Sequence, residues 1–171
     1  MLNPETNANR RDEAGYTLVE LLIIMSVILI IITLAIPSYQ KVHIKANETS
    51  AMASVRMLNS METEYNSSFP SHGFACSLAA LGGKTGSGAP TPEAAQLIPD
   101  DLSSGSKAGY NFTISNCQKN TVNNVDQYNS YQITATPVAV GKSGQRTFCS
   151  DESGQLHFDP KGGTNCTEIL Q

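Results

Sequence analysis

Hydrophobic and polar positions divide the chain into an apolar N-terminal segment and a far more polar remainder. Residues 16–36 read YTLVELLIIMSVILIIITLAI and are almost wholly apolar. As a helix rising ~1.5 Å per residue, a segment of about 21 residues spans roughly 32 Å, enough for a hydrocarbon core of ~30 Å. The pattern therefore predicts a transmembrane helix. Arg10 and Arg11 precede it and favour a cytoplasmic N-terminus with an exported C-terminal part.

A cleaved secretory signal is the first alternative for this segment. Such signals have an apolar region of about 7–15 residues that ends in a small-residue cleavage site. Here the apolar run is longer and continues into Pro37-Ser38-Tyr39. A plain membrane anchor is the second alternative, but it gives no reason for Glu20 inside the apolar segment. A carboxylate there is costly and usually marks function, unless it lies at the headgroup boundary and stays solvated.

The chain stays compatible with a helix from Ser38 to about Asn66. Pro37 lacks an N–H and clashes with the carbonyl four residues back, which predicts a kink. Beyond it, one apolar face recurs at helical spacing and needs a packing partner: Ala51, Val55, Leu58, Met61 and Tyr65. The charged residues around this face are interpreted as solvated: Lys41, Lys45, Glu48, Arg56, Glu62 and Glu64. The helix is expected to stop at Ser67-Ser68-Phe69-Pro70.

The remaining residues predict a small antiparallel sheet. Residues 71–107 are loop-like, with a short helical turn expected at Glu93 to Leu97. Four strands are predicted after them: Tyr110–Asn116, Tyr128–Thr136, Gln145–Ser150 and Gln155–Phe158. Turn residues at 140–144 and 151–154 predict hairpins between the last three strands. The expected fold class is therefore α+β, a long N-terminal helix packed on an antiparallel sheet of about four strands.

Four cysteines lie in the part expected to be exported: Cys76, Cys117, Cys149 and Cys166. An even number of cysteines outside the cytoplasm indicates disulfides, and three pairings are possible. We favour Cys76–Cys117 with Cys149–Cys166, because each bridge then stays local to one loop system. Zinc binding is disfavoured, since no CxxC occurs and the three histidines are dispersed.

Composition excludes several classes of function. The net charge of −4 argues against electrostatic binding of bulk nucleic acid, and the mean hydropathy of −0.20 excludes a multi-span membrane protein. No nucleophile and base have a credible spacing, so we expect no enzymatic activity, no cofactor and no metal site. Gly83-Lys84-Thr85 lacks the earlier glycine of a phosphate-binding loop, where Leu78 stands. A Ca²⁺ site built from Asp151, Glu152 and Asp159 is less favoured than ordinary turn acids.

The residues around Glu20 carry a family resemblance. Gly15-Tyr16-Thr17-Leu18-Val19-Glu20, followed by the apolar run, resembles the signal sequence of type IV prepilins and pseudopilins. That pattern is a glycine, an aromatic residue that is usually Phe, a Thr, an aliphatic pair and a Glu. Pro37, the 22nd residue after Gly15, matches a proline that many members carry. Tyr16 in place of Phe and the acidic pair Asp12-Glu13 depart from the pattern.

The resemblance implies a processing route and an assembly route. A membrane-embedded prepilin peptidase would cut between Gly15 and Tyr16, removing a leader of residues 1–15, and would methylate the new amine of Tyr16. Thr17 and Glu20 would act in assembly, with Glu20 neutralising the N-terminus of an adjacent subunit. An unpaired carboxylate is costly in a lipid-like filament core, so this pair would set register more than it adds stability.

The resemblance also implies a domain organisation. A hydrophobic assembly helix would cover residues 16–37, an amphipathic helix residues 38–67 and an exported globular domain residues 68–171. The chain is expected in the inner membrane before assembly and in an extracellular or periplasmic filament afterwards.

The function expected from the resemblance is that of a structural subunit of a type IV pilus or pilus-like filament, serving adhesion, motility or DNA uptake. Its partners would be its own copies, other pilins, the prepilin peptidase and methylase, an inner-membrane assembly platform and membrane lipid. A type II secretion pseudopilin or minor pilin is the alternative within this machinery, and the C-terminal disulfide loop favours a pilin. A monomeric membrane-anchored domain that binds an envelope partner is the alternative from another class.

Overall fold

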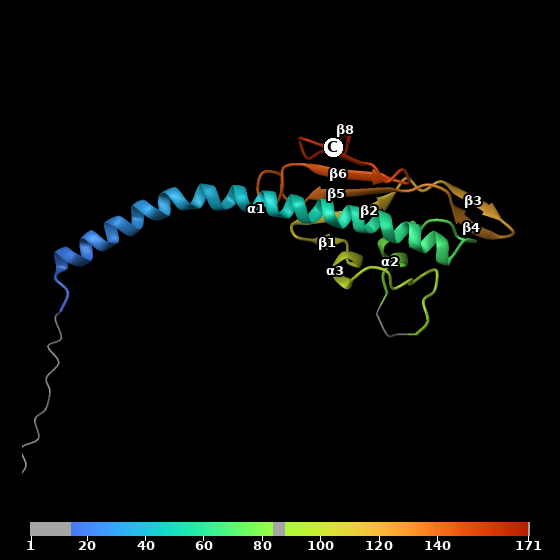
Figure 1. The fold of residues 1–171 in the computed structure, drawn as a ribbon, viewed down its shortest axis with the longest axis horizontal. Coiled ribbons are helices and arrows are strands. Elements are labelled where there is room, and N and C mark those ends of the chain that lie inside the picture. Colours follow the sequence, from blue (N-terminus) through green and yellow to red (C-terminus); the bar gives the residue numbers. More distant parts are fainter. Residues whose placement is uncertain (1–14, 84–87, 171) are drawn as a thin grey trace, which may run out of the picture. The chain divides into compact units, whose positions relative to one another are not determined.

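The computed structural model describes residues 15–83 and 88–170, without the side chains of residues 34–38. The chain forms two units, residues 1–39 and residues 40–171. One helix, α1 (Leu18–Ser68), runs through both, and its end at Ser68 confirms the predicted stop (Figure 1). The helix is continuous in secondary structure across Pro37, whose side chain lies outside the described part.

An antiparallel sheet forms the main layer of the second unit. Its strands are ordered β1 (Ser106–Lys107), β2 (Tyr110–Ser115), β5 (Gln132–Pro137), β6 (Thr147–Asp151), β7 (Leu156–Asp159) and β8 (Glu168–Ile169). In the central pairs, Ile114 faces Ile133, and Phe148 faces Phe158. Burial alternates along β2 and β5, whereas the first four residues of β6 are all buried, so β6 is the most enclosed strand.

The second half of α1 packs on this sheet. Four of the five residues on the predicted apolar face are buried, and Met61 is partly buried. Asn59 joins the two layers, because its Nδ2 donates to Ser150 Oγ at 2.6 Å and its Oδ1 accepts from Tyr131 Oη at 3.1 Å. The largest fully buried apolar side chains come from the helix, the 78–102 segment and the sheet: Tyr110, Phe148, Leu58, Leu81, Leu102, Ile133 and Val55.

The prediction of about four strands was too low. The main sheet has six strands, but β1 and β8 have two residues each and are too short to show a pattern. A separate hairpin joins β3 (Lys119–Val122) and β4 (Val125–Tyr128). Its turn residues Asn123 and Asn124 both have positive φ, 53° and 62°, as a two-residue hairpin turn requires. Every residue of β3 is exposed, so burial imposed no alternation there.

The described parts of segment 71–107, residues 71–83 and 88–107, contain more regular structure than predicted. It contains α2 (Leu78–Leu81) and α3 (Asp100–Ser103), each four residues long and therefore too short for a helical pattern. Ser77 caps α2, since its Oγ accepts from the Ala80 N–H at 3.1 Å. The helical turn predicted at Glu93 to Leu97 is wrong: a turn closes between Thr91 and Ala94, and the residues after it are not helical.

Candidate processing and assembly site

The predicted cleavage junction lies just before α1. Gly15, Tyr16 and Thr17 are not helical, and α1 begins at Leu18. Tyr16 is 77% exposed, and a Cβ built on Gly15 would meet no atom within 4 Å. Nothing in the described part of the chain blocks the Gly15–Tyr16 peptide bond. The rest of the predicted leader, with Arg10, Arg11, Asp12 and Glu13, lies outside the described residues.

Thr17 and Glu20 cap the start of α1 by reciprocal hydrogen bonds. The Glu20 N–H donates to Thr17 Oγ1 at 3.2 Å, and the Thr17 N–H donates to Glu20 Oε2 at a longer 3.5 Å. This is a capping box, in which a Thr and the Glu three residues later satisfy two backbone N–H groups that the helix leaves free. In the uncut chain the Glu20 carboxylate is therefore bound to its own helix. The T-x-x-E spacing carries this signal, and sequence reasoning missed it.

Between Leu18 and Thr33, α1 carries apolar side chains around its whole circumference apart from Glu20, Ser26 and Thr33. The two hydroxyl side chains of this stretch turn back to the backbone, with Ser26 Oγ donating to the Ile23 carbonyl and Thr33 Oγ1 to the Ile30 carbonyl. The large apolar side chains are all exposed: Leu18, Val19, Leu21, Leu22, Ile23, Ile24, Met25, Val27, Ile28, Leu29, Ile30, Ile31 and Ile32. A helix that is apolar all round needs to be buried by lipid or protein.

A comparison with known protein families matched residues 10–36 to the prokaryotic N-terminal methylation motif. These residues are a type IV pilin-type or pseudopilin-type prepilin signal. The comparisons with curated proteins and with solved structures found no match.

The prepilin signal implies processing by a prepilin peptidase and assembly with other pilins. It indicates a structural, non-enzymatic protein that is made as a membrane-anchored precursor. A transmembrane helix was expected over residues 16–36. Among the described residues, no helix has the length and apolarity needed to cross a membrane. The expected span includes residues 34–36, whose side chains are outside the described part.

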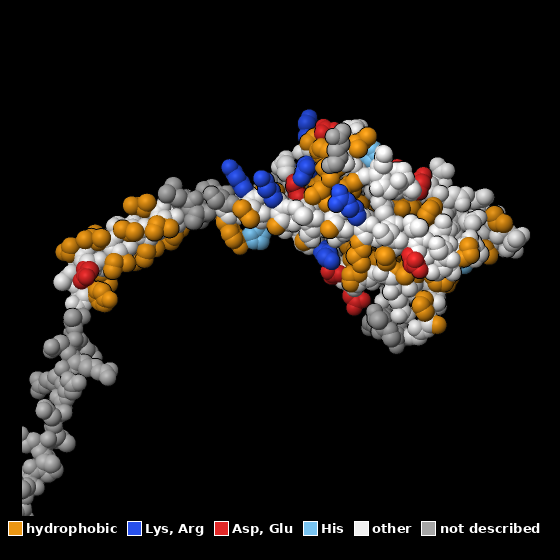
Figure 2. Space-filling view, viewed as in Figure 1, with side chains coloured by type: hydrophobic (Ala, Val, Ile, Leu, Met, Phe, Trp, Pro, Cys, Tyr) orange, Lys and Arg blue, Asp and Glu red, His pale blue; other side chains and the backbone are white. Residues whose placement is uncertain are grey.

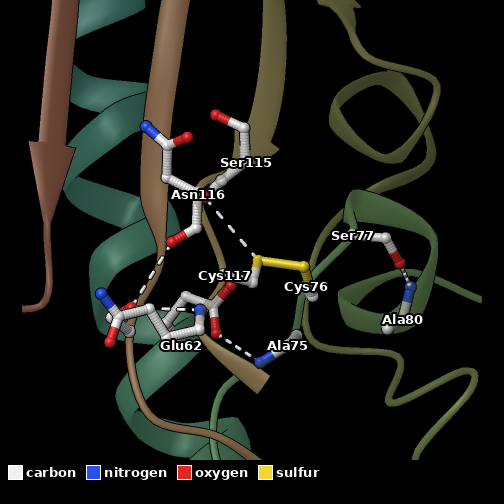
Figure 3. The surroundings of a disulfide bond; sticks show 10 residues. Glu62, Ala75, Cys76, Ser77, Ala80, Ser115, Asn116 and Cys117 are labelled. Carbon is white, nitrogen blue, oxygen red and sulfur yellow. Dashed lines mark hydrogen bonds between the residues drawn. A yellow bond between two sulfur atoms is a disulfide. The ribbon is translucent and has the colours of Figure 1, made fainter.

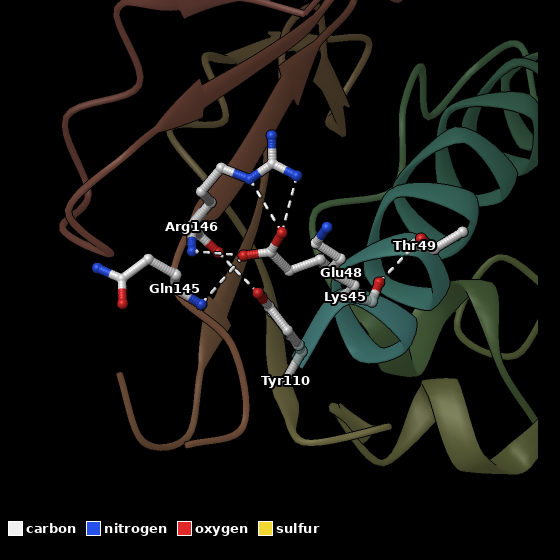
Figure 4. Close-up of polar contacts among 6 residues, drawn as sticks. All are labelled: Lys45, Glu48, Thr49, Tyr110, Gln145 and Arg146. Carbon is white, nitrogen blue, oxygen red and sulfur yellow. Dashed lines mark hydrogen bonds and ion pairs between the residues drawn. The ribbon is translucent and has the colours of Figure 1, made fainter. Parts of the chain in front are cut away.

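Beyond the prepilin signal, Glu48 fastens α1 to the sheet. Its Oε1 accepts from the N–H groups of Gln145 and Arg146, each at 3.1 Å. Its Oε2 accepts from Arg146 Nε at 3.0 Å and from Nη2 at 2.7 Å (Figure 4). Burial acts to raise the pKa of Glu48, but these hydrogen bonds and the Arg146 charge outweigh it and lower the pKa below its ordinary value.

Glu62 is the second carboxylate buried under the sheet. It is 0% exposed, and its Oε2 accepts from the Ala75 N–H at 2.8 Å, next to the Cys76–Cys117 disulfide (Figure 3). Its Oε1 has no hydrogen-bond partner among the described residues. Burial raises the pKa of Glu62 to about 8, because the single hydrogen bond from Ala75 offsets little of the desolvation. The prediction that Glu48 and Glu62 are solvated was wrong, although Lys41, Lys45, Arg56 and Glu64 are exposed.

The structure contains two disulfides, and they are the pairs favoured by the sequence. Cys76–Cys117 ties the segment after α1 to the end of the β2 region, and Cys149–Cys166 ties β6 to the C-terminal tail. Two of the three acids weighed as Ca²⁺ ligands bond their own turns: Asp151 Oδ1 accepts from the Ser153 N–H and Asp159 Oδ1 from the Lys161 N–H.

Proposed function

We propose that this chain is a structural subunit of a type IV pilus or pilus-like filament, assembled through its N-terminal helix. One observation carries the proposal. Apart from Glu20 and Ser26, the helix segment from Leu18 to Ile32 is apolar and exposed on all sides, it lies within the prepilin signal, and the same helix continues into a unit with two disulfides. Such a surface is costly in water, and copies of the same segment provide the apolar partner that a filament core requires.

Glu20 supplies the register of this assembly. The capping box holds its carboxylate against the Thr17 N–H of the same chain. That hydrogen bond is long and exposed, so an ammonium group can readily replace the Thr17 N–H as the partner of the carboxylate. Cutting before Tyr16 creates such a group, and its pairing with the Glu20 of a neighbouring copy removes an uncompensated charge from the apolar core. A subunit that is out of register leaves this carboxylate unpaired.

The test is a filament assay on cells that express only the variant chain. We expect Glu20→Gln to enter the membrane and be cut normally but to give few sheared filaments. Glu64→Gln is the matched control, because it removes one exposed carboxylate from the same helix outside the apolar segment. A normal filament yield from Glu20→Gln would refute the assembly role.

Mass spectrometry of sheared wild-type filaments tests the proposal as a whole. The expected result is this chain as the main component, beginning at methylated Tyr16. A cut and methylated chain that stays in the envelope and never forms the bulk of a filament would favour the pseudopilin or minor-pilin role. The C-terminal disulfide loop, closed by Cys149 and Cys166, supports the pilin role. An uncut chain would leave only a membrane-anchored envelope domain.

A further inference from the structure

One end of the unit formed by residues 40–171 gathers positive charges, four on exposed lysines and one on the half-buried Arg146. Five cations form what we call the basic rim: Lys41, Lys45, Lys142, Arg146 and Lys161. Figure 2 shows Lys and Arg side chains grouped over the start of this unit's helix and the adjoining end of the sheet. Lys41, Lys45 and Arg146 line one groove there together with Glu48.

Two turns bring the remaining lysines to the same end. Asn47 Nδ2 donates to the Ser143 carbonyl at 2.8 Å, which holds the turn that bears Lys142 against α1. The turn that bears Lys161 lies against the first one, because a Cβ on Gly162 would come 2.8 Å from the Val140 side chain.

Most of these charges are not neutralised. The three ion pairs found in the described part of the chain are Lys107–Asp101, Lys119–Asp126 and Arg146–Glu48. None of them involves a lysine of the basic rim. The buried Asp159 and the exposed Glu168 lie on the neighbouring strands β7 and β8. Together with Glu48 they are three acids against five cations, so the rim keeps a net positive charge in a chain of net charge −4.

Exposed aliphatic side chains lie among the lysines. Val42 is 66% exposed, Val138 59% and Val140 50%. Cations interleaved with aliphatic groups are the composition of surfaces that rest on anionic bilayers, where lysine ammonium groups meet phosphates and the aliphatic groups enter the interface.

Chain connectivity places one residue of the rim, Lys41, close to the apolar segment. Lys41 is five residues after Ile36, and helix rise limits that separation to about 8 Å whatever the angle between the two units. This is the distance at which the headgroup layer begins if residues 16–36 lie in the hydrocarbon core.

We propose that the basic rim binds the anionic phospholipid headgroups of the bilayer that holds the precursor. This inference rests on the proposed function, since it requires the apolar segment to anchor the chain before assembly. Binding at the rim holds the exported unit against the membrane surface, and extraction into a filament breaks these contacts.

The test uses the full-length, oxidised chain in phosphatidylcholine vesicles, with or without one third phosphatidylglycerol. Flotation with phosphatidylcholine alone reports the anchoring by residues 16–36, so failure of the proposed function is seen separately. Hydrogen exchange of peptides covering residues 138–146 and 158–163 reports the rim. We expect exchange to slow several-fold with phosphatidylglycerol and to recover in about 1 M salt, where charges are screened beyond ~3 Å.

Two double variants make the test specific. Lys142→Gln with Lys161→Gln should abolish the effect of phosphatidylglycerol, whereas Lys107→Gln with Lys119→Gln, which removes equal charge elsewhere, should leave it. Equal exchange in both vesicles overturns the proposal. Protection that depends on protein density and not on phosphatidylglycerol also overturns it, because the rim would then face the acidic surface of another copy.

Discussion

The carboxylate of Glu48 and the guanidinium of Arg146 meet at 2.7 Å, although 98 positions separate the two residues in the chain. Two backbone N–H groups of the β5–β6 connection donate to the other oxygen of the same carboxylate. The Arg146 side chain also lies over the rings of Phe148 and Phe158, at 5.3 and 5.5 Å. Glu48 thus binds both the backbone of a turn and the cation that packs over two core aromatic rings.

Replacing Glu48 with Gln should lower the stability of the unit formed by residues 40–171 by about 1–3 kcal/mol, because charge-assisted hydrogen bonds are lost in a nearly buried site. Urea unfolding of the full chain in detergent measures the change, and Glu64→Gln is the control. The folded-state pKa of Glu48 is lowered, so its stabilisation is present above the ordinary value of 4.5 and fades as pH falls through the lower folded value. Equal midpoints for Glu48→Gln and wild type would show that the contact adds nothing.

Replacing Glu62 with Gln should raise the stability of the folded chain at neutral pH. The folded chain keeps the Glu62 proton up to about pH 8, whereas the unfolded chain releases it near 4.5. As the pH rises from 4.5 to about 8, the free energy of unfolding of the wild type should therefore decrease, by at most roughly 1.4 kcal/mol per pH unit. Gln keeps the shape of the neutral acid and an acceptor for the Ala75 N–H, so unfolding curves of this variant should lose that slope. An unchanged slope would mean that Glu62 is ionised in the folded chain.

Gly15→Val should block cleavage of the leader. A Cβ at this position meets nothing in the chain's own fold, so loss of processing would reflect the peptidase and not misfolding. Gly15→Ala is the matched control, since the smaller side chain is expected to be cut. The size of the accumulated chain on a gel decides the outcome, and normal processing of Gly15→Val would place the cut elsewhere.

Removing the C-terminal bridge by Cys149→Ser with Cys166→Ser should release the tail before the rest unfolds. The bridge spans a sequence separation of 17, which corresponds to about 3 kcal/mol in the chain-entropy account. Besides the bridge, the tail is held by the two residues of β8, by the Leu170 N–H that donates to the Leu156 carbonyl, and by packing of Leu170 against the core. Limited proteolysis should cut the variant after residue 159 first. A tail as resistant as in the wild type would contradict this.

The helix and the central strands could be predicted because their buried residues recur at the spacing of a helix or a strand. Val55 and Leu58 repeat at helical spacing, and Ile133 and Ala135 alternate, since each faces the same core. The burial of Glu48 and Glu62 was not predictable, because it depends on Arg146 and on Ala75, which the fold brings into contact. The exposed β3–β4 hairpin also gave no pattern, yet its Asn-Asn turn was a usable signal.

In the candidate site, too, some features could be predicted from the sequence and others could not. Gly15, Tyr16 and Glu20 could be selected from local sequence, since the prepilin signal is contiguous. The capping role of Thr17 is equally local, because it depends only on a Glu three positions later. Whether Glu20 pairs with a neighbouring copy depends on a second chain, and no single sequence contains that information.

The two disulfides also set how far the unit formed by residues 40–171 can stretch under load. In the proposed filament, tension would enter a subunit through α1, and any strand that unfolds would lengthen the chain. The loops closed by Cys76–Cys117 and Cys149–Cys166 have sequence separations of 41 and 17, and a covalent bridge keeps both closed even when their hydrogen bonds break. At ~3.5 Å per extended residue, the two closed loops remove roughly 200 Å from the length that the unfolded chain could reach. A fibre of such subunits would yield over a short distance and then stiffen.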